Sequence, residues 1–158
     1  MKRLAMILLV ASGAAFAAPP IGTPDQISTA VDSKGAQAFF ESLSEDDADK
    51  LMDKIGSGQS QWIALAPKLA KGADASNAEG LGIELAYALP KNPTAVLGVV
   101  DPVDGDGHSL QVSRVCGIPF IETIPRGYKA KALRAVEKVS DPQLQQIKAR
   151  CLKALENS

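Results

Sequence analysis

The chain has 158 residues, of which 46% are hydrophobic and 4% aromatic, and its formal net charge is −1 at pH 7. This length is typical of a single domain that can bury a hydrophobic core without the help of a metal. No basic stretch is present to neutralise phosphates, so nucleic acid and an anionic membrane surface are excluded as expected partners.

Residues 1–17 have the pattern of a cleavable secretory signal. Lys2 and Arg3 precede a short apolar run, residues 4–10, and an Ala15-Phe16-Ala17 cleavage motif follows. Cleavage after Ala17 leaves residues 18–158, with a net charge of about −3 because two basic residues are lost. The apolar run is far shorter than the ~20 residues that a bilayer span requires. We therefore expect a periplasmic or secreted protein with no stable membrane insertion after cleavage.

The two cysteines, Cys116 and Cys151, both lie in the exported part of the chain. An even number of cysteines in an oxidising compartment indicates a disulfide. Two free thiols or a metal pair are the alternatives, but neither a C-x-x-C spacing nor nearby histidines support them. We expect one disulfide between Cys116 and Cys151.

The first half of the exported chain reads as a series of short helices. After a proline-rich leader, residues 18–24, the stretch Thr23–Gln26 has a threonine cap, a proline at the first helical position and a glutamine at N3. Apolar residues recur at helical spacing in residues 36–43, and Ser44 can cap the next helix. A further helix is expected over residues 61–71, with a kink or a new turn at Pro67.

The central part is predicted to hold the most enclosed helix. Ser76-Asn77-Ala78-Glu79 reads as a capping box that opens a helix to about Leu89, and its apolar composition indicates a central position. Gly80 and Gly82 are expected to let a neighbouring element approach closely. Asn92-Pro93 is expected to start another helix through Val100, with a strand as the alternative.

The C-terminal third begins with an ambiguous stretch. Residues 110–124 fit either helix or extended chain, and we favour a helical turn followed by an extended, packed segment. Helical stripes then follow in residues 128–139 and 144–155, separated by a turn at Ser140-Asp141-Pro142.

These elements predict an all-α fold, a single domain of about six or seven short helices packed as helical hairpins. The arrangement resembles the hairpin stacking of HEAT-like solenoids, although no residue pattern repeats at a fixed period, and an irregular bundle fits equally well.

The stretch Asp101–His108 is the most site-like loop, because three aspartates and flexible glycines could supply oxygen ligands to calcium. It fails the EF-hand pattern in both registers: a start at Asp104 puts Val115 where glutamate belongs, and a start at Asp101 puts Val103 at the third ligand position. We therefore expect a solvated loop, and no metal or cofactor.

Glu84 and Glu122 are candidates for catalysis, because both are acids in apolar sequence surroundings where a raised pKa is useful. Their structural alternatives are an exposed helix face for Glu84 and hydrogen bonds to backbone amides for Glu122. Trp62 is expected to anchor the core.

No plausible catalytic set emerges from these residues. We expect an exported, non-enzymatic helical binding module that acts by protein–protein contact in the bacterial envelope, in one version an immunity or inhibitor-type protein. The segment Gly117–Arg126 is a candidate contact surface, because a proline-bracketed stretch is rigid at low entropic cost, but such rigidity equally serves the fold alone, and from the sequence we favour this structural role. The alternatives are an envelope hydrolase that uses Glu84 or Glu122, and a carrier for a small ligand or lipid.

Overall fold

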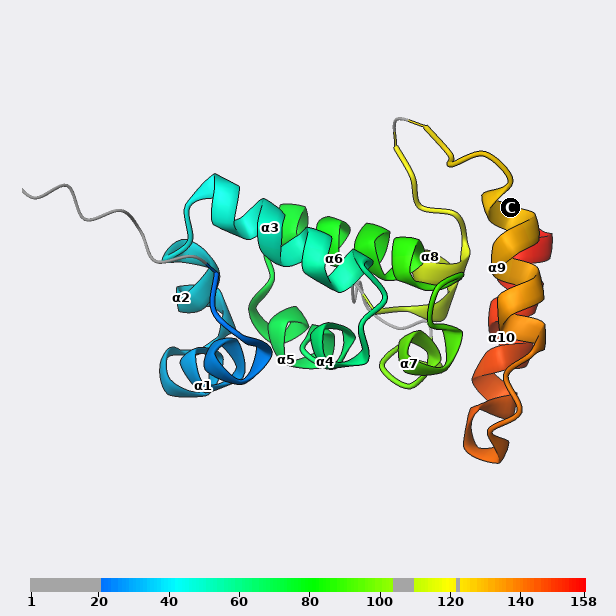
Figure 1. The fold of residues 1–158 in the computed structure, drawn as a ribbon, viewed down its shortest axis with the longest axis horizontal. Helices are drawn as coiled ribbons and strands as arrows, with labels where there is room; N and C mark the ends of the chain where they lie inside the picture. Colours follow the sequence, from blue (N-terminus) through cyan, green and yellow to red (C-terminus); the bar gives the residue numbers. More distant parts are fainter. Residues whose placement is uncertain (1–20, 104–109, 122) are drawn as a thin grey trace, which may run out of the picture.

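The computed structural model describes residues 21–103, 110–121 and 123–158, so the predicted signal peptide lies outside the described chain. Among the described residues, Asp101 and Gln111 form an isolated β-bridge, and the regular secondary structure is otherwise helical. The prediction of an all-α fold is confirmed (Figure 1). The elements are α1 (Pro24–Lys34), α2 (Ala36–Glu41), α3 (Glu45–Gly56), α4 (Ser60–Ile63), α5 (Ala66–Leu69), α6 (Ala75–Ala88), α7 (Pro93–Leu97), α8 (Val112–Cys116), α9 (Tyr128–Glu137) and α10 (Gln145–Glu156), with 3₁₀ turns η1 (Ala70–Gly72) and η2 (Pro142–Leu144).

Local capping explains where several helices begin. Thr23 forms the predicted capping box with Gln26, whose side-chain oxygen accepts a hydrogen bond from the Thr23 amide at 2.8 Å. The Ser44 hydroxyl accepts from the amide of Asp47 at the start of α3, and the Asn92 side chain accepts from that of Ala95 at the start of α7. Each cap satisfies an amide that has no partner within its own helix.

Two predicted boundaries are wrong. Helix α6 begins at Ala75 rather than after Ser76, because the carboxylate of Asp74 accepts from the Asn77 amide at 2.8 Å and so caps the helix earlier. Helix α7 ends at Leu97 rather than at Val100. The chain then turns, with the Val100 amide still donating to the carbonyl of Val96, so the strand alternative for this segment is also wrong.

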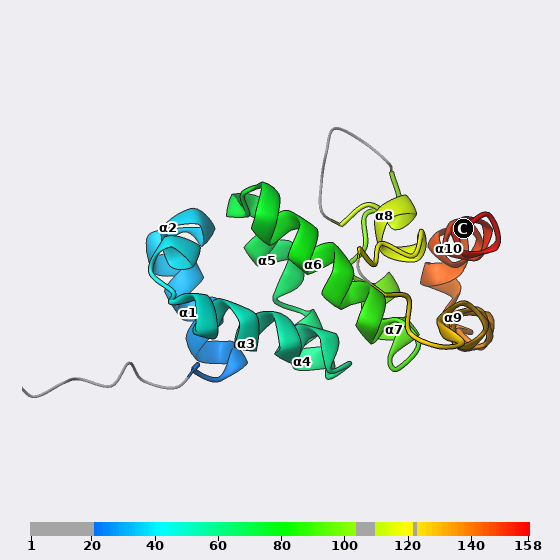
Figure 2. The same cartoon turned by 90° about the horizontal axis from the view of Figure 1, so that it is seen from above.

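Helix α6 lies at the centre of the molecule, as its apolar composition predicts (Figure 2). It packs against α3, α7 and α8, and Leu81, Leu85 and Leu89 have no solvent exposure. The close approach of α3 occurs at buried Gly56, where a β-carbon would overlap the Glu84 carboxylate. Gly80, by contrast, has room for a methyl group, since its nearest neighbour would be Met52 at 3.7 Å. The expectation of a close approach at Gly80 is therefore wrong.

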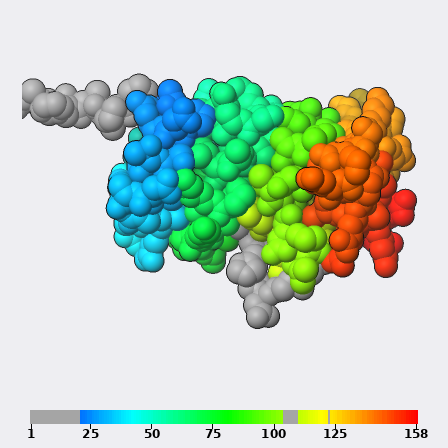
Figure 3. Space-filling model, turned by 90° about the horizontal axis from the view of Figure 1, so that it is seen from below, coloured from blue at the N-terminus to red at the C-terminus, as the bar shows by residue number. Residues whose placement is uncertain are grey.

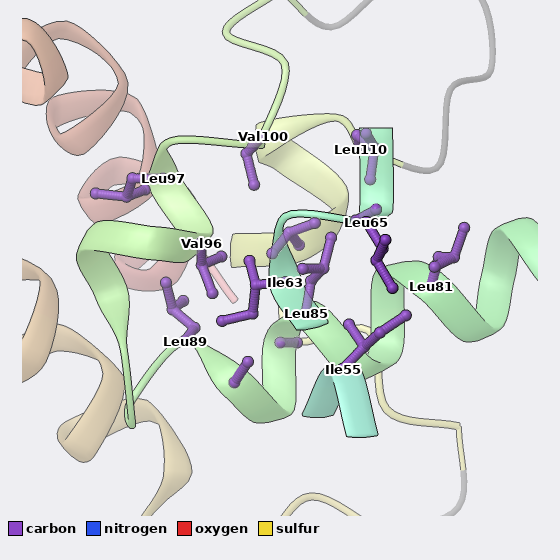
Figure 4. Close-up of a cluster of buried hydrophobic side chains, with 14 of the residues drawn as sticks. Ile55, Ile63, Leu65, Leu81, Leu85, Leu89, Val96, Leu97, Val100 and Leu110 are labelled. Atoms are coloured by element: carbon purple, nitrogen blue, oxygen red, sulfur yellow. The ribbon is translucent and has the colours of Figure 1, made fainter. Parts of the chain in front are cut away.

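The hydrophobic core contains side chains from along the whole described chain, from Ile27 in α1 to Leu155 in α10. Figure 4 shows Ile55, Ile63, Leu85 and Val96 pointing toward one another from α3, α4, α6 and α7, and each is fully buried. Trp62 is 6% exposed and belongs to this core, as predicted. None of the described helices has the length and hydropathy needed to cross a membrane.

The C-terminal helices α9 and α10 form a hairpin at one end of the molecule (Figure 1). Cys151 of α10 is disulfide-bonded to Cys116 of α8, and both residues are fully buried, which confirms the predicted pair. Helix α8 also packs against α6, so the bridge joins the terminal hairpin to an element that contacts the central helix.

Candidate functional site

The predicted site residues fall partly within the described chain. Glu84 lies in α6 and Asp101 follows α7, whereas Glu122 and residues 104–108 are outside the described residues. The catalytic role considered for Glu122 and the solvated loop expected at Asp101–His108 are therefore untested.

Glu84 is half-buried where α6 faces α3. Its pKa is raised to about 7, mainly because burial disfavours the charged carboxylate and secondarily because Asp53 repels it, while Lys91 acts in the opposite direction. The ammonium of Lys91 donates a hydrogen bond to the carbonyl of Gly56 at 2.6 Å. Glu84 thus belongs to a polar cluster in a helix–helix contact, rather than to an exposed helix face.

Asp101 has a local structural role. Its Oδ1 accepts from the Val103 amide at 2.9 Å, and its backbone amide and carbonyl pair with Leu110 and Val112, respectively. Among the described residues, no three His, Cys, Asp or Glu side chains gather closely enough to hold a metal.

A basic pocket lies between the C-terminal end of α6 and helix α9. We give this name to a hollow of about 480 Å³ whose lining contains five cationic side chains among tyrosine, proline and alanine. The lining residues are Tyr87, Pro90, Lys91, Pro125, Arg126, Tyr128, Lys131, Arg134, Ala135 and Lys138.

The pocket was not predicted from the sequence, although the sequence contains one signal of it. Lys131 and Arg134 of α9 and its C-cap residue Lys138, which keeps a helical conformation, recur at i, i+3 and i+7 and so share one face. Arg126 lies two residues before α9, whereas Lys91 joins them only because the fold brings the end of α6 beside α9. The net charge of the whole chain is close to zero, so it gives no sign of this cluster.

Charge is distributed unevenly along the chain. Residues 126–158 contain eight Lys or Arg and three Asp or Glu, a net charge of +5, whereas residues 18–125 contain seven and fifteen, a net charge of −8. The chain is laid out in sequence order along its long axis, from blue to red in Figure 3. The molecule therefore has an acidic body and a basic C-terminal end.

The second surface feature is the presenting segment, our name for residues 117–127, of which residue 122 is outside the described chain. Its described part has no regular secondary structure, and Figure 1 shows it rising beyond the helices between α8 and α9. The prediction of a helical turn followed by extended chain is confirmed, but the prediction that the extended part is packed is wrong, because much of it is exposed. Ile121 and Ile124 are 69% and 55% exposed.

The base of the presenting segment is held firmly. The ring of Phe120 packs against the rings of Tyr87 and Tyr128, with centroids 4.6 and 4.7 Å away. The buried hydroxyl of Tyr128 donates to the carbonyl of Ala86 at 2.9 Å, and burial raises the pKa of this hydroxyl. Ile118 has a φ of 58°, a conformation that a β-branched residue rarely adopts and that the surrounding contacts must enforce.

No protein-family model matches the chain, and comparison with curated proteins and with solved structures finds no significant similarity.

Proposed function

We propose that this protein is an exported, non-enzymatic helical binding module that acts by protein–protein contact, and that the presenting segment is its contact surface. The exposure of Ile121 and Ile124 at the tip of an anchored segment carries the proposal. Large apolar side chains in the solvent cost free energy that a partner's apolar groove recovers. The export and the envelope location rest on the predicted signal at residues 1–17 and on the disulfide.

The way the segment is anchored supports a role in binding. A loop that is already ordered loses little conformational entropy when a partner docks on it. Here the Cys116–Cys151 bond precedes the segment, the Phe120 ring fixes its middle, and buried Tyr128 follows its end. An exposed tip on a rigid base is the arrangement expected of an inhibitor-type protein, which is the specific version that we propose.

Site-specific photo-crosslinking in envelope extracts tests the proposal. A photoreactive residue at 121 or 124 should give the same adduct at both positions, because both side chains would lie in the contact. Ile124→Asp, combined with the crosslinker at 121, should abolish that adduct. Val103 is a matched control because it is also apolar and 61% exposed, but it lies outside the segment.

Val103→Asp should leave the adduct unchanged. Equal adducts from positions 103, 121 and 124, or none from 121 and 124, would contradict the assignment of the contact surface. Circular dichroism at 222 nm and the melting temperature of each variant would establish that the fold is retained.

A further inference from the structure

The basic pocket is a binding site in its own right. We propose that it binds a small organic anion that carries a phosphoryl group, with the phosphoryl oxygens held by the cations of α9 and the organic part against the tyrosine and proline lining. This inference does not depend on the presenting segment being a contact surface for a partner protein.

The cations of the pocket converge from three parts of the chain. Lys131, Arg134 and Lys138 follow one face of α9, and at 1.5 Å rise per residue they span about 10 Å along the helix. Lys91 comes from the turn after α6, and Arg126 from the end of the presenting segment. A row of charges on a helix is commonly a solvated face, but here side chains from other elements close the row into a hollow.

Within the described part of the chain, no ion pair joins these cations to a carboxylate, although Lys91 also attracts Glu84 and donates to the carbonyl of Gly56. The ion pairs found there are Lys50–Asp47 and Lys68–Asp32, both remote in sequence from the pocket. Like charges three and four residues apart destabilise a helix. The free energy that this repulsion costs would be recovered by a multiply charged anion in the hollow.

The composition of the pocket indicates the class of ligand. Arginine binds phosphate oxygens through two parallel hydrogen bonds, and lysine binds them as a compact charge. A phosphomonoester carries up to two negative charges, so it matches a multiply cationic lining better than a single carboxylate does. The hollow of about 480 Å³ exceeds the size of an inorganic ion, and Tyr87, Tyr128 and Pro125 offer apolar contact to an organic group.

Two sources can provide this chemistry: a free phosphorylated metabolite and the headgroup of a phospholipid. Isothermal titration of the purified, disulfide-bonded protein with phenyl phosphate measures the first. Cosedimentation with phosphatidylcholine vesicles that contain phosphatidic acid measures the second. Benzoate, which has the same ring and a carboxylate, is the matched control ligand.

We expect phenyl phosphate to bind more tightly than benzoate. Arg134→Gln should weaken its binding about tenfold or more, because a charge-assisted hydrogen bond contributes roughly 1.5–3 kcal/mol and 1.4 kcal/mol is a factor of ten. Lys153→Gln removes one charge from the same hairpin outside the pocket and should leave binding within about twofold. Ile121→Ser changes the presenting segment without replacing a lining residue or adding a charge beside the pocket, so a failure of one proposal is distinguishable from a failure of the other.

Four results would contradict the inference. Equal affinities for phenyl phosphate and benzoate would exclude recognition of the phosphoryl group. Equal losses in Arg134→Gln and Lys153→Gln would reduce the effect to general attraction of anions. Binding of an acidic peptide that displaces phenyl phosphate, and is tighter than it, would reassign the pocket to an acidic partner protein. Vesicle binding without binding of free phenyl phosphate would restrict the ligand to a lipid headgroup and contradict a pocket for free metabolites.

Discussion

Glu84 couples the stability of the fold to pH. Its folded-state pKa of about 7 lies above the ordinary value of 4.5, so the folded protein binds this proton more tightly than the unfolded chain does. The stability that the protonated carboxyl contributes is fully present below pH 4.5 and is lost as the pH rises toward 7. Asp53 and Lys91 are the charged neighbours that shift this pKa, in opposite directions.

Replacing Glu84 by glutamine should remove this pH dependence while keeping the shape of the side chain. Between about pH 5 and 7, the free energy of unfolding of the unmodified protein should fall by about 1–2 kcal/mol relative to Glu84→Gln, a value reduced because the group is only half-buried. Urea denaturation across this range measures the difference. Asp53→Asn should make the fall smaller, because it removes the repulsion. Parallel pH profiles for the protein and Glu84→Gln would contradict this account.

At the scale of elements, two glycines differ in the space that their neighbours leave for a side chain. A β-carbon at Gly72 would lie 2.8 Å from the backbone carbonyl carbon of Ala36, so η1 and α2 would have to move apart. A β-carbon at Gly80 on α6 would meet only flexible Met52 at ordinary contact distance. A backbone segment moves aside less easily than a flexible side chain. Replacement by alanine is therefore expected to lower the stability at Gly72 and to raise it at Gly80.

Gly72→Ala should lower the free energy of unfolding by about 2 kcal/mol, as overpacking commonly does. Gly80→Ala should raise it by about 0.5–1 kcal/mol, because alanine is the better helix former. Chemical denaturation of both variants measures these changes. A stabilised Gly72→Ala variant would show that η1 and α2 are not tightly packed.

The disulfide is the covalent link between elements that are distant in sequence. Cys116 and Cys151 are 35 residues apart, and closing a loop of this length stabilises a fold by about 4 kcal/mol on the chain-entropy model. The double variant Cys116→Ala/Cys151→Ala should therefore lose about 3–4 kcal/mol of unfolding free energy in guanidinium titrations. A reductant should destabilise the unmodified protein similarly and leave the double variant unchanged. Equal stability with and without reductant would assign no stabilising role to the bond.

Local signals predicted the elements better than they predicted the boundaries. Thr23, Ser44 and Asn92 cap their own helices, so short stretches of sequence sufficed to place α1, α3 and α7. Asp74 and Ser76 are both good caps two residues apart, and the sequence alone could not decide between them.

On the scale of the whole molecule, the basic pocket could be predicted only in part. The cationic face of α9 was readable from residues 131–138, but the arrival of Lys91 beside it depends on long-range packing of α6. The presenting segment was anticipated as a rigid surface, whereas the exposure of its isoleucines required the structure. A sequence pattern predicts one helix or loop at a time. It does not predict a site whose residues come from several elements that meet only in the folded protein.

The separation of charge makes a prediction for the whole molecule. Although its net charge is negative, the protein should be retained on a sulfonated cation-exchange resin at pH 7 and low salt, because its basic end can face the resin. The triple variant Lys131→Gln/Arg134→Gln/Lys138→Gln should elute at a clearly lower salt concentration. Unchanged elution of this variant would show that the α9 face does not dominate the interaction.

The bond between Cys116 and Cys151 closes a covalent ring that contains both the presenting segment and α9. A single peptide-bond cleavage anywhere inside this ring leaves the two fragments joined. A protease that cut between Ile121 and Ile124 would therefore release nothing, and the nicked chain would separate into two bands only after reduction. The presenting segment can therefore be cleaved by a protease and still remain attached to the helical body of the protein.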